Sequence, residues 1–197
     1  MSIETRKYEL KARAASKRKT RERITKAAAE LHEELGVART TVAQIARRAG
    51  VQRLTVYNHF PELSDLLPAC AGHYQSQHPF PDIGAALALD DPVARLRAVL
   101  GDVYAWYREI EPMMGKLVAD RSSVPALDDY MKANSDRAVA DLAAGLAAGF
   151  RARGPRAERV RALTALALDF GAWRRLDHEG LEDVSAAELM ADVVAAT

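Results

Sequence analysis

Cysteine is almost absent from this chain of 197 residues, since Cys70 is the only one. A single thiol cannot form an internal disulfide, and it leaves no CxxC pair for a zinc ribbon or a redox centre. Long apolar runs are missing too: stretches such as LAAGLAAGF (142–150) are far shorter than the roughly 20 residues that cross a bilayer. The opening residues, MSIETRKYELK, lack the apolar segment of a secretory leader. We therefore expect a soluble, cytoplasmic chain with no membrane partner.

Catalytic signatures are also missing, because the sequence has no glycine-rich phosphate loop, nucleophile elbow or HExxH motif. Cys70 and His73 stand one helical turn apart, which would suit a nucleophile with its base or two metal ligands. No third ligand or orienting group accompanies them, so a buried thiol and a surface imidazole are the favoured interpretation. The other four histidines are scattered. We predict no enzymatic activity, no catalytic residues, no metal site and no cofactor.

Charge is present but unevenly distributed. The net charge is only +1, yet residues 1–60 contain 14 Lys and Arg against 6 Asp and Glu, a balance of +8. The remaining residues contain 14 basic and 21 acidic side chains, a balance of −7. An asymmetry of this kind indicates that the N-terminal part meets an anionic partner.

Helical periodicity runs through the whole chain and no segment has the alternation of a strand, so we predict an all-α fold of about nine helices. The sequence QSQHPFPDIGAALALDD (75–91) has little periodicity and marks a junction. The predicted organisation is a basic N-terminal arm (1–16), a helix-turn-helix domain of three helices (17–66), a connecting helix and linker (67–91), and a C-terminal helical domain (92–197).

Proline, glycine and capping residues predict the helix ends of the C-terminal domain. Asp91 and Pro92 open a helix that Pro112 ends. A long helix then stops at Gly154, and another runs from Pro155 to Gly180. A capping box of Ser185 and Glu188 is predicted to open the last helix.

The segment ARTTVAQIARRAGVQRLTVYNHF (38–60) packs two short helical patterns around one Ala-Gly pair. Thr41 and Gln44 form a capping box at the start of the first, and Gly50 suits a turn with positive φ. Two short helices joined in this way can place the first across a DNA backbone and the second in the major groove. The competing interpretation is an ordinary helical corner of an all-α protein.

The second short helix keeps Val51 and Val56 for the shared core and leaves polar side chains outside. Arginine can bind guanine through two hydrogen bonds, leucine or threonine can contact a thymine methyl, and threonine, tyrosine and histidine can donate to phosphates. A basic cluster (Lys17, Arg18, Lys19, Arg21 and Arg23) precedes the motif and favours DNA over the helical corner. The predicted outward-facing residues are Gln52, Arg53, Leu54, Thr55, Tyr57, Asn58 and His59.

Residues 20–66 resemble the DNA-binding domain of the tetracycline-repressor (TetR) family of bacterial regulators. The likeness rests on the apolar register of the first helix, the TTVAQIARRAGV core and the VYNHF ending. It implies a homodimer on a near-palindromic operator, and an all-helical C-terminal domain that binds a ligand and dimerises through its last two long helices.

By position, the resemblance assigns phosphate contacts to Thr41, Tyr57 and His59, with Thr40 beside them, and base reading to residues 52–55. Two positions depart from the family pattern. Pro61, Glu62 and Leu63 stand where a lysine often contacts phosphate. Gln52 stands where Ser or Thr commonly caps the recognition helix, which leaves either a weaker cap or an added base contact.

The C-terminal domain carries two further sets of candidates. Aromatic and methionine side chains form adaptable pocket walls, although for each one taken singly a place in the core is the favoured interpretation. Apolar residues at helical spacing in RALTALALDFGAW and LMADVVAA are the best dimer faces. The predicted pocket residues are Trp106, Tyr107, Met113, Met114, Phe150, Phe170 and Trp173, and the predicted dimer residues are Leu163, Leu166, Phe170, Leu189 and Val193.

These patterns favour a homodimeric, ligand-responsive regulator of transcription that binds double-stranded DNA and a small apolar effector. One alternative is a constitutive or architectural DNA-binding dimer whose cavity is filled by side chains. Another is an enzyme or protein-interaction module that reuses the fold.

Overall fold

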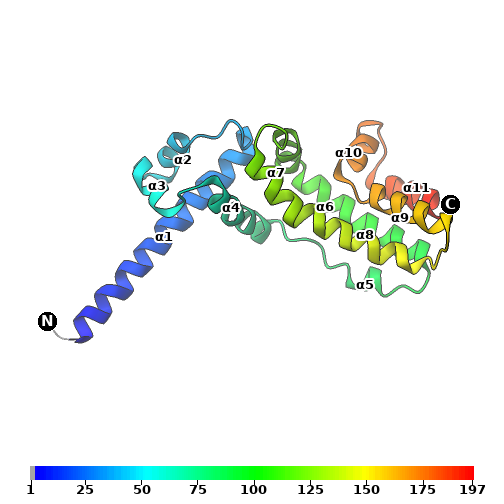
Figure 1. Ribbon diagram of the computed structural model, residues 1–197, viewed down its shortest axis with the longest axis horizontal. Coiled ribbons are helices and arrows are strands. Elements are labelled where there is room, and N and C mark those ends of the chain that lie inside the picture. Colours follow the sequence, from blue (N-terminus) through cyan, green and yellow to red (C-terminus); the bar gives the residue numbers. More distant parts are fainter. Residues whose placement is uncertain (1–2) are drawn as a thin grey trace. The chain divides into compact units, whose positions relative to one another are not determined.

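The computed structural model describes the backbone of residues 3–197 and the side chains from Leu10 onward. The all-α prediction is confirmed: the described residues form helices α1 to α11 and one π turn, η1, with no strand among them (Figure 1). None of the described helices is both long and apolar enough to span a membrane. The chain divides into two compact units, one built from residues up to Gln77 with Pro112–Tyr130, the other from His78–Glu111 and Met131–Thr197.

The first unit is built on one long helix, α1 (Ile3–Leu35), against which α2 (Val42–Ala49) and α4 (Leu63–Gln77) pack. Helix α3 (Arg53–His59) packs on α2. Alanines dominate where the helices meet, and their small side chains let the backbones approach closely. The buried side chains of this core are Ile24, Ala27, Ala28, Ala29 and Leu31 from α1, Ile45, Ala46 and Ala49 from α2, Val56, Phe60, and Leu66 and Cys70 from α4.

The N-terminal part of α1 extends beyond this core. Side chains from Leu10 to Lys19 are all exposed, and burial begins at Ile24. The predicted boundary between arm and domain at residues 16 and 17 lies inside one continuous helix, because no glycine or proline interrupts the sequence before Gly36. Residues 1 and 2 of the predicted arm lie outside the described residues.

The ends of α1 and α2 confirm the sequence signals there. Gly36, with φ of +86°, ends α1, and the nearby Asp120 carboxylate accepts a hydrogen bond from the backbone N–H of Ala38 (3.0 Å). Thr41 and Gln44 form the predicted capping box, each side chain accepting from the other residue's backbone N–H. The turn between α2 and α3 therefore follows a helix whose start and end are both defined by local chemistry.

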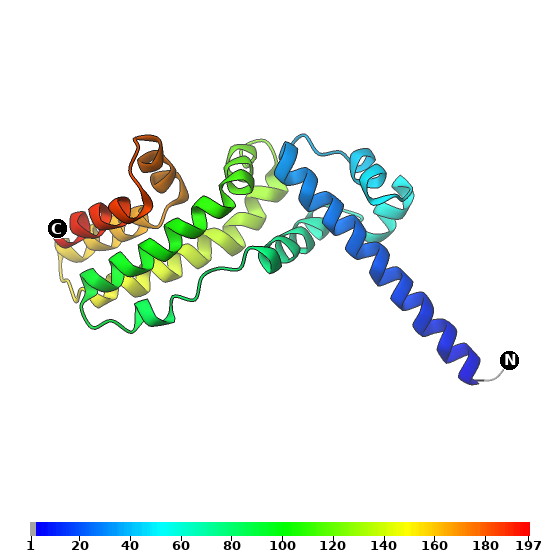
Figure 2. The same cartoon turned by 180° about the vertical axis from the view of Figure 1, so that it is seen from behind.

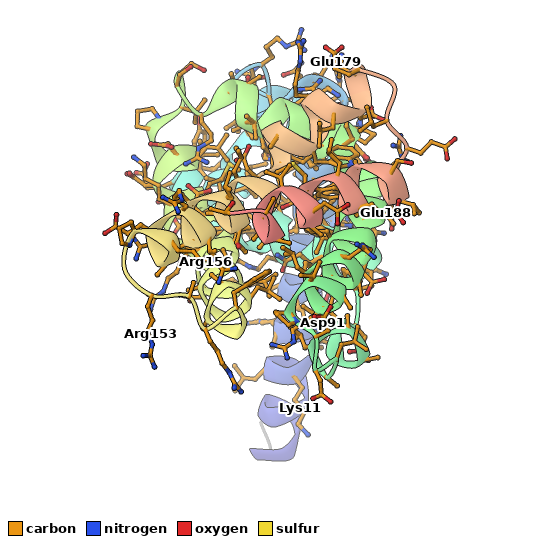
Figure 3. The ribbon with its side chains drawn as sticks, turned by 90° about the vertical axis from the view of Figure 1, so that its right-hand side faces the viewer. Lys11, Asp91, Arg153, Arg156, Glu179 and Glu188 are labelled. Carbon is orange, nitrogen blue, oxygen red and sulfur yellow. The ribbon has the colours of Figure 1, made fainter. Side chains whose placement is uncertain are left out.

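The second unit is a bundle of helices that includes the N-terminal part of α6 (Pro92–Asp120) (Figure 2). Its pairs α8–α9 and α9–α11 pack against each other, and exposed charges such as Arg153, Arg156 and Glu188 cover its surface (Figure 3). Helix α6 contributes residues to both units. The remaining elements are α5 (Gly84–Leu87), α6 (Pro92–Asp120), α7 (Pro125–Met131), η1 (Lys132–Asp136), α8 (Arg137–Gly149), α9 (Pro155–Ala167), α10 (Phe170–His178) and α11 (Asp183–Ala195).

Three predicted helix ends are wrong. Helix α6 passes through Pro112 to Asp120, because buried residues on either side, Ile110 and Met113, keep it packed although the proline lacks an N–H. Helix α8 ends at Gly149, five residues before Gly154. The last helix begins at Asp183, so Ser185 lies inside it and the predicted capping box is not formed.

The predicted helix from Pro155 to Gly180 is divided into α9 and α10 at Leu168 and Asp169. The Asp169 carboxylate accepts from the backbone N–H of Ala172 (2.9 Å) and starts α10. Two buried tyrosines of α6 stabilise the break, since the Tyr104 hydroxyl donates to the Ala167 carbonyl (2.7 Å) and the Tyr107 hydroxyl to the Leu168 carbonyl (2.7 Å). The division therefore depends on partners about 60 residues away, which no local pattern reveals.

His32 is a buried titratable group of the first unit, with only 3% of its surface exposed. Burial lowers its pKa from 6.5 to about 4, and the nearby Asp120 carboxylate opposes this shift only in part. The native state therefore holds a neutral imidazole at neutral pH.

We expect the free energy of unfolding to fall as the pH drops from about 6.5 to about 4, because over this range the unfolded chain binds a proton at His32 and the native chain does not. The loss should total about 3 kcal/mol. Urea unfolding of the parent and of His32→Leu at pH 7.5, 6 and 5 measures it, and the variant should lose less stability than the parent. Parallel declines in the two proteins would show that His32 does not contribute.

Candidate nucleic-acid interface

Helix α3 presents a nearly complete polar face to solvent. Its only buried side chain is Val56, and the predicted base-reading residues stand outside it. Leu54 is 67% exposed and Tyr57 is 50% exposed, which leaves apolar surface in water that a DNA groove could cover. The exposed residues of the segment are Gln52, Arg53, Leu54, Tyr57 and Asn58, and Thr55 and His59 are half-buried.

The start and end of α3 differ in chemistry. Gln52 occupies the N-cap position without a side-chain capping bond, so the weaker-cap alternative holds and its amide stays free for other partners. At the other end, partial burial lowers the pKa of His59, and the positive charges of Lys17 and Arg21 lower it further. A neutral imidazole beside two cations therefore closes the recognition helix.

Thr40 and Thr41 already use their hydroxyl protons within the protein. Thr40 donates to the Gly36 carbonyl (2.7 Å), and Thr41 donates to the Gln44 side-chain oxygen (2.7 Å). A phosphate contact through either hydroxyl would require giving up that bond. The family-based assignment of phosphate contacts to these two threonines thus competes with their role in ending α1 and starting α2.

The predicted basic cluster of α1 falls into two groups. Lys17, Arg18 and Lys19 are exposed, and Arg18 forms only an exposed ion pair with Glu22 (3.6 Å). Exposed pairs of this kind are weak, so these three charges remain available to an anion.

Arg21 and Arg23 form the second group, and both bind backbone carbonyls of the helix-turn-helix. Arg23 donates from Nε to the Ala49 carbonyl (3.1 Å) and from Nη2 to the Gly50 carbonyl (3.0 Å). Arg21 donates to the His59 carbonyl (2.6 Å). Sequence reasoning grouped both with the basic cluster, because a backbone acceptor leaves no signal in residue types.

A third arginine joins α2 to α1. Arg48 makes paired hydrogen bonds to the two carboxylate oxygens of Glu34 (2.5 and 2.8 Å), and these bonds lower the pKa of Glu34. Arg48 contacts neither α3 nor the turn in any of these bonds.

In the second unit, the predicted pocket residues gather only in part. Tyr107, Phe170 and Trp173 form a buried cluster with ring centroids 5.3 to 5.7 Å apart, and Trp106 lies 5.7 Å from Tyr107. Met113 and Met114 belong to the first unit. Phe150 is half-buried at the end of α8. The aromatic rings therefore fill the space between α6 and α10 with each other.

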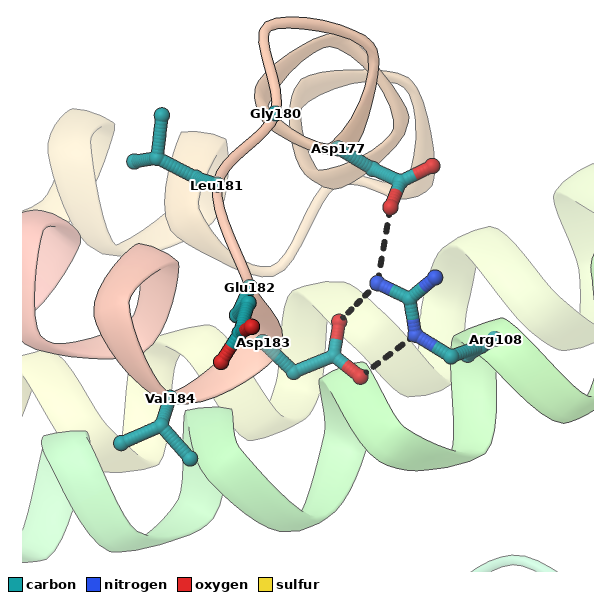
Figure 4. Close-up of a pocket in the computed structure, with 7 residues that line it drawn as sticks. All are labelled: Arg108, Asp177, Gly180, Leu181, Glu182, Asp183 and Val184. Atoms are coloured by element: carbon teal, nitrogen blue, oxygen red, sulfur yellow. Dashed lines mark hydrogen bonds and ion pairs between the residues drawn. The ribbon is translucent and has the colours of Figure 1, made fainter.

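A hollow of about 460 Å³ lies beside this cluster and has a charged lining (Figure 4). Arg108 of α6 crosses it and binds Asp183 through Nε and Nη2 (2.8 Å each) and Asp177 through Nη2 (2.7 Å). Trp173 donates to the same Asp183 carboxylate (3.0 Å), and these bonds lower the pKa of Asp183 against the effect of its burial. The arginine thus ties the end of α10 and the start of α11 to α6.

The predicted dimer residues also divide. Leu166 of α9 and Leu189 and Val193 of α11 are 50%, 44% and 40% exposed, and these two helices pack together. Leu163 is half-buried. Phe170 does not belong to this face, because its ring is buried against Tyr107 and Trp173. Unpaired apolar surface on two adjacent helices is typical of a subunit interface.

The described residues contain no group of three or more His, Cys, Asp or Glu side chains placed to bind a metal ion. Cys70 is buried, its Sγ lies 3.7 Å from the Thr25 carbonyl, and burial raises the pKa of its thiol to about 12. A thiol of this kind is unreactive, as the sequence interpretation of a buried cysteine required.

Comparison with known proteins connects this geometry to a family. Residues 24–70 match the family described as bacterial regulatory proteins, tetR family. The chain is 42% identical over 76 residues to TtgW, an HTH-type transcriptional regulator of Pseudomonas putida. The matched segment covers 36% of this chain and 55% of that protein. The chain therefore spans about half the length of this curated relative.

Solved structures share the fold over most of the chain. A TetR-like transcriptional regulator from Rhodococcus sp. RHA1 has a TM-score of 0.61 at 18% identity, over 89% of this chain and 93% of its own. The SmeT–triclosan complex has a TM-score of 0.58 at 21% identity, over 90% of both chains. These identities establish a common fold and no common ligand.

Proposed function

The chain belongs to the TetR family of bacterial regulatory proteins through its N-terminal domain, and we propose that it is a repressor that binds a near-palindromic operator as a homodimer. The observation that carries the proposal is the exposed face at the start of α3, which presents Gln52, Arg53 and Leu54 to solvent. The preceding helix, α2, begins at the Thr41 capping box and ends at Gly50, which makes the turn into α3. Regulators of this family are DNA-binding transcription factors and not enzymes. Such a repressor would act in the cytoplasm, where bacterial DNA lies.

Within this proposal the side chains have different tasks. Gln52, Arg53, Leu54 and Thr55 read bases, since they occupy the first turn of α3. Phosphates are contacted from two helices: Tyr57, Asn58 and His59 belong to α3, and Lys17, Arg18 and Lys19 extend the contact as a positive surface along α1.

The proposal is tested by selecting tight binders from a random duplex pool at two salt concentrations and sequencing them. We expect an inverted repeat that persists at the higher salt. Arg53→Ala should weaken binding to it by about 1 to 3 kcal/mol and relax the preference at one position of each half-site. Arg18→Ala should instead weaken all sequences alike and reduce the salt dependence by about one phosphate contact.

Binding without any enriched sequence, lost steeply as salt rises, would contradict a sequence-specific repressor. It would favour the architectural DNA-binding dimer. Unchanged affinity after charge reversal of Arg53 and of the Lys17 to Lys19 cluster would show that this surface does not bind DNA, and it would favour an enzyme or protein-interaction module.

The homodimer that the operator requires is proposed to form through α9 and α11. Leu166, Leu189 and Val193 place apolar surface on these adjacent helices, and a two-fold axis there would let each subunit cover the same face of the other. Two reading helices about one turn of DNA apart, roughly 34 to 36 Å, would then meet the two half-sites.

We expect Leu166→Glu with Val193→Glu to weaken the dimer by at least about tenfold, because each charge would have to be buried without a partner. Analytical ultracentrifugation over a concentration series measures the dissociation constant. Val118→Glu is the matched control, since Val118 is similarly exposed (43%) but lies on α6 in the first unit. A double variant that dimerises like the parent would place the interface elsewhere.

The effector is proposed to be a small, largely apolar aromatic molecule that inserts among Tyr107, Phe170 and Trp173. These rings already contact each other edge-on or tilted between α6 and α10, so an aromatic ligand could replace contacts that the cluster makes with itself. The SmeT–triclosan complex, which shares the fold, supports this ligand class. Binding would need α10 to move away from α6, against the bonds of Arg108 to Asp177 and Asp183.

Triclosan is the first probe. Added at about one hundred times its dissociation constant, it should stabilise the protein by about 2.7 kcal/mol and raise the unfolding temperature by several degrees. If it is an inducer, its affinity measured by isothermal titration must fall when the selected duplex is present, since coupling is reciprocal. No thermal shift would exclude this ligand from the cluster, and equal affinities with and without duplex would exclude it as an inducer.

A further inference from the structure

Helix α3 has little of its own to hold it in place. It is seven residues long, lacks a side-chain cap at its start and buries only Val56. Isolated helices of this length are unstable in water, so the position of α3 must come from contacts with the rest of the domain. Base recognition depends on that position, because a hydrogen bond to a base tolerates only small displacements.

Arg23 of α1 holds the turn that precedes α3. Its guanidinium donates to the Ala49 carbonyl from both Nε and Nη2 and to the Gly50 carbonyl from Nη2 (3.0 Å). The guanidinium can lie against the turn because Gly50 has no side chain, and a Cβ there would be 3.2 Å from Nη2. A lysine has one ammonium and cannot reproduce this forked arrangement.

Arg21, two residues earlier on α1, holds the other end of α3. Its Nη1 donates to the carbonyl of His59, the last residue of the helix (2.6 Å), and its guanidinium carbon lies 3.9 Å from the centroid of the Phe60 ring. The end of a helix carries free carbonyls with partial negative charge, which a cation stabilises. The Phe60 ring beneath the guanidinium adds a cation–π contact that helps to hold it in place.

We propose that Arg21 and Arg23 are positioning residues that fix the two ends of the recognition helix on α1, and that their main effect on DNA binding is on sequence discrimination. The inference rests on the proposed DNA-binding function. It separates these two arginines from Lys17, Arg18 and Lys19, which have no backbone partner on α3 in the structure and act by charge. Their guanidinium shape, and not their charge, is what recognition requires.

The two roles respond differently to lysine. Arg21→Lys with Arg23→Lys keeps both positive charges, so attraction to any duplex should stay within about twofold of the parent and the salt dependence should not change. Loss of the forked bonds should lower the ratio of specific to non-specific affinity by about tenfold or more. Arg48→Lys is the matched control, since Arg48 also bridges to α1 through paired bonds but contacts Glu34 instead of α3 or the turn.

The experiment selects binders from a random duplex pool with the parent, the double variant and the control, at least about 20 °C below the lowest unfolding midpoint. Parent and control should enrich the same inverted repeat, and the double variant should bind the pool but enrich it poorly. Hydrogen exchange of the free proteins gives a second readout: amides of Thr55 to Phe60 should exchange faster in the double variant, with α2 and α4 unchanged.

Three results would overturn the proposal. A double variant that enriches the repeat as well as the parent would show that the forked bonds do not guide recognition. Weaker pool binding with a reduced salt dependence would make the arginines phosphate contacts. If the parent enriches no repeat and the exchange of α3 is the same in the parent and the double variant, the positioning role is refuted. If the parent enriches no repeat but α3 exchanges faster in the double variant, the two arginines do hold α3 and only the proposed operator is refuted.

Discussion

The close approach of α2 to α1 is the constraint on which the reading surface depends. Ala28 on one helix and Ala46 and Ala49 on the other leave room for the backbones to approach closely. The same approach brings the turn carbonyls at Ala49 and Gly50 within reach of Arg23. A long helix with a small-residue face therefore supports a short helix that could not support itself.

In the second unit, large aromatic side chains and not alanines hold the helices together at the break between α9 and α10. Tyr104 and Tyr107 of α6 satisfy the carbonyls that become free where α9 ends, and Phe170 and Trp173 of α10 then pack against Tyr107. Arg108 adds ion pairs to Asp177 near the end of α10 and to Asp183 at the start of α11. The rings of this region are buried, and the ion pairs of Arg108 lie at its surface.

The candidate site was accessible to sequence reasoning where function depends on exposed side chains. Gln52, Arg53 and Leu54 could be assigned to the surface because Val51 and Val56 had to face the core, and Gly50 and Thr41 mark the turn by their own chemistry. The tasks of Arg21 and Arg23 could not be assigned, since their partners are backbone carbonyls 26 to 38 residues away and every residue has a carbonyl. The sequence likewise did not show that the Thr40 and Thr41 hydroxyls donate to the Gly36 carbonyl and the Gln44 side chain, and that these bonds compete with a phosphate contact.

The amino-acid sequence by itself determined the helical class, the helix-turn-helix with its capping box, and the basic N-terminal part, because periodicity, capping and charge are properties of neighbouring residues. Only the tertiary structure decided that α6 continues through Pro112, that Leu168 and Asp169 divide a helix, and that Phe170 faces a cluster instead of a subunit face. Each of these outcomes depends on groups distant in the chain, which supply buried surface or satisfy freed carbonyls. Such contacts exist only once the helices have packed, and their free energy outweighs the local preference.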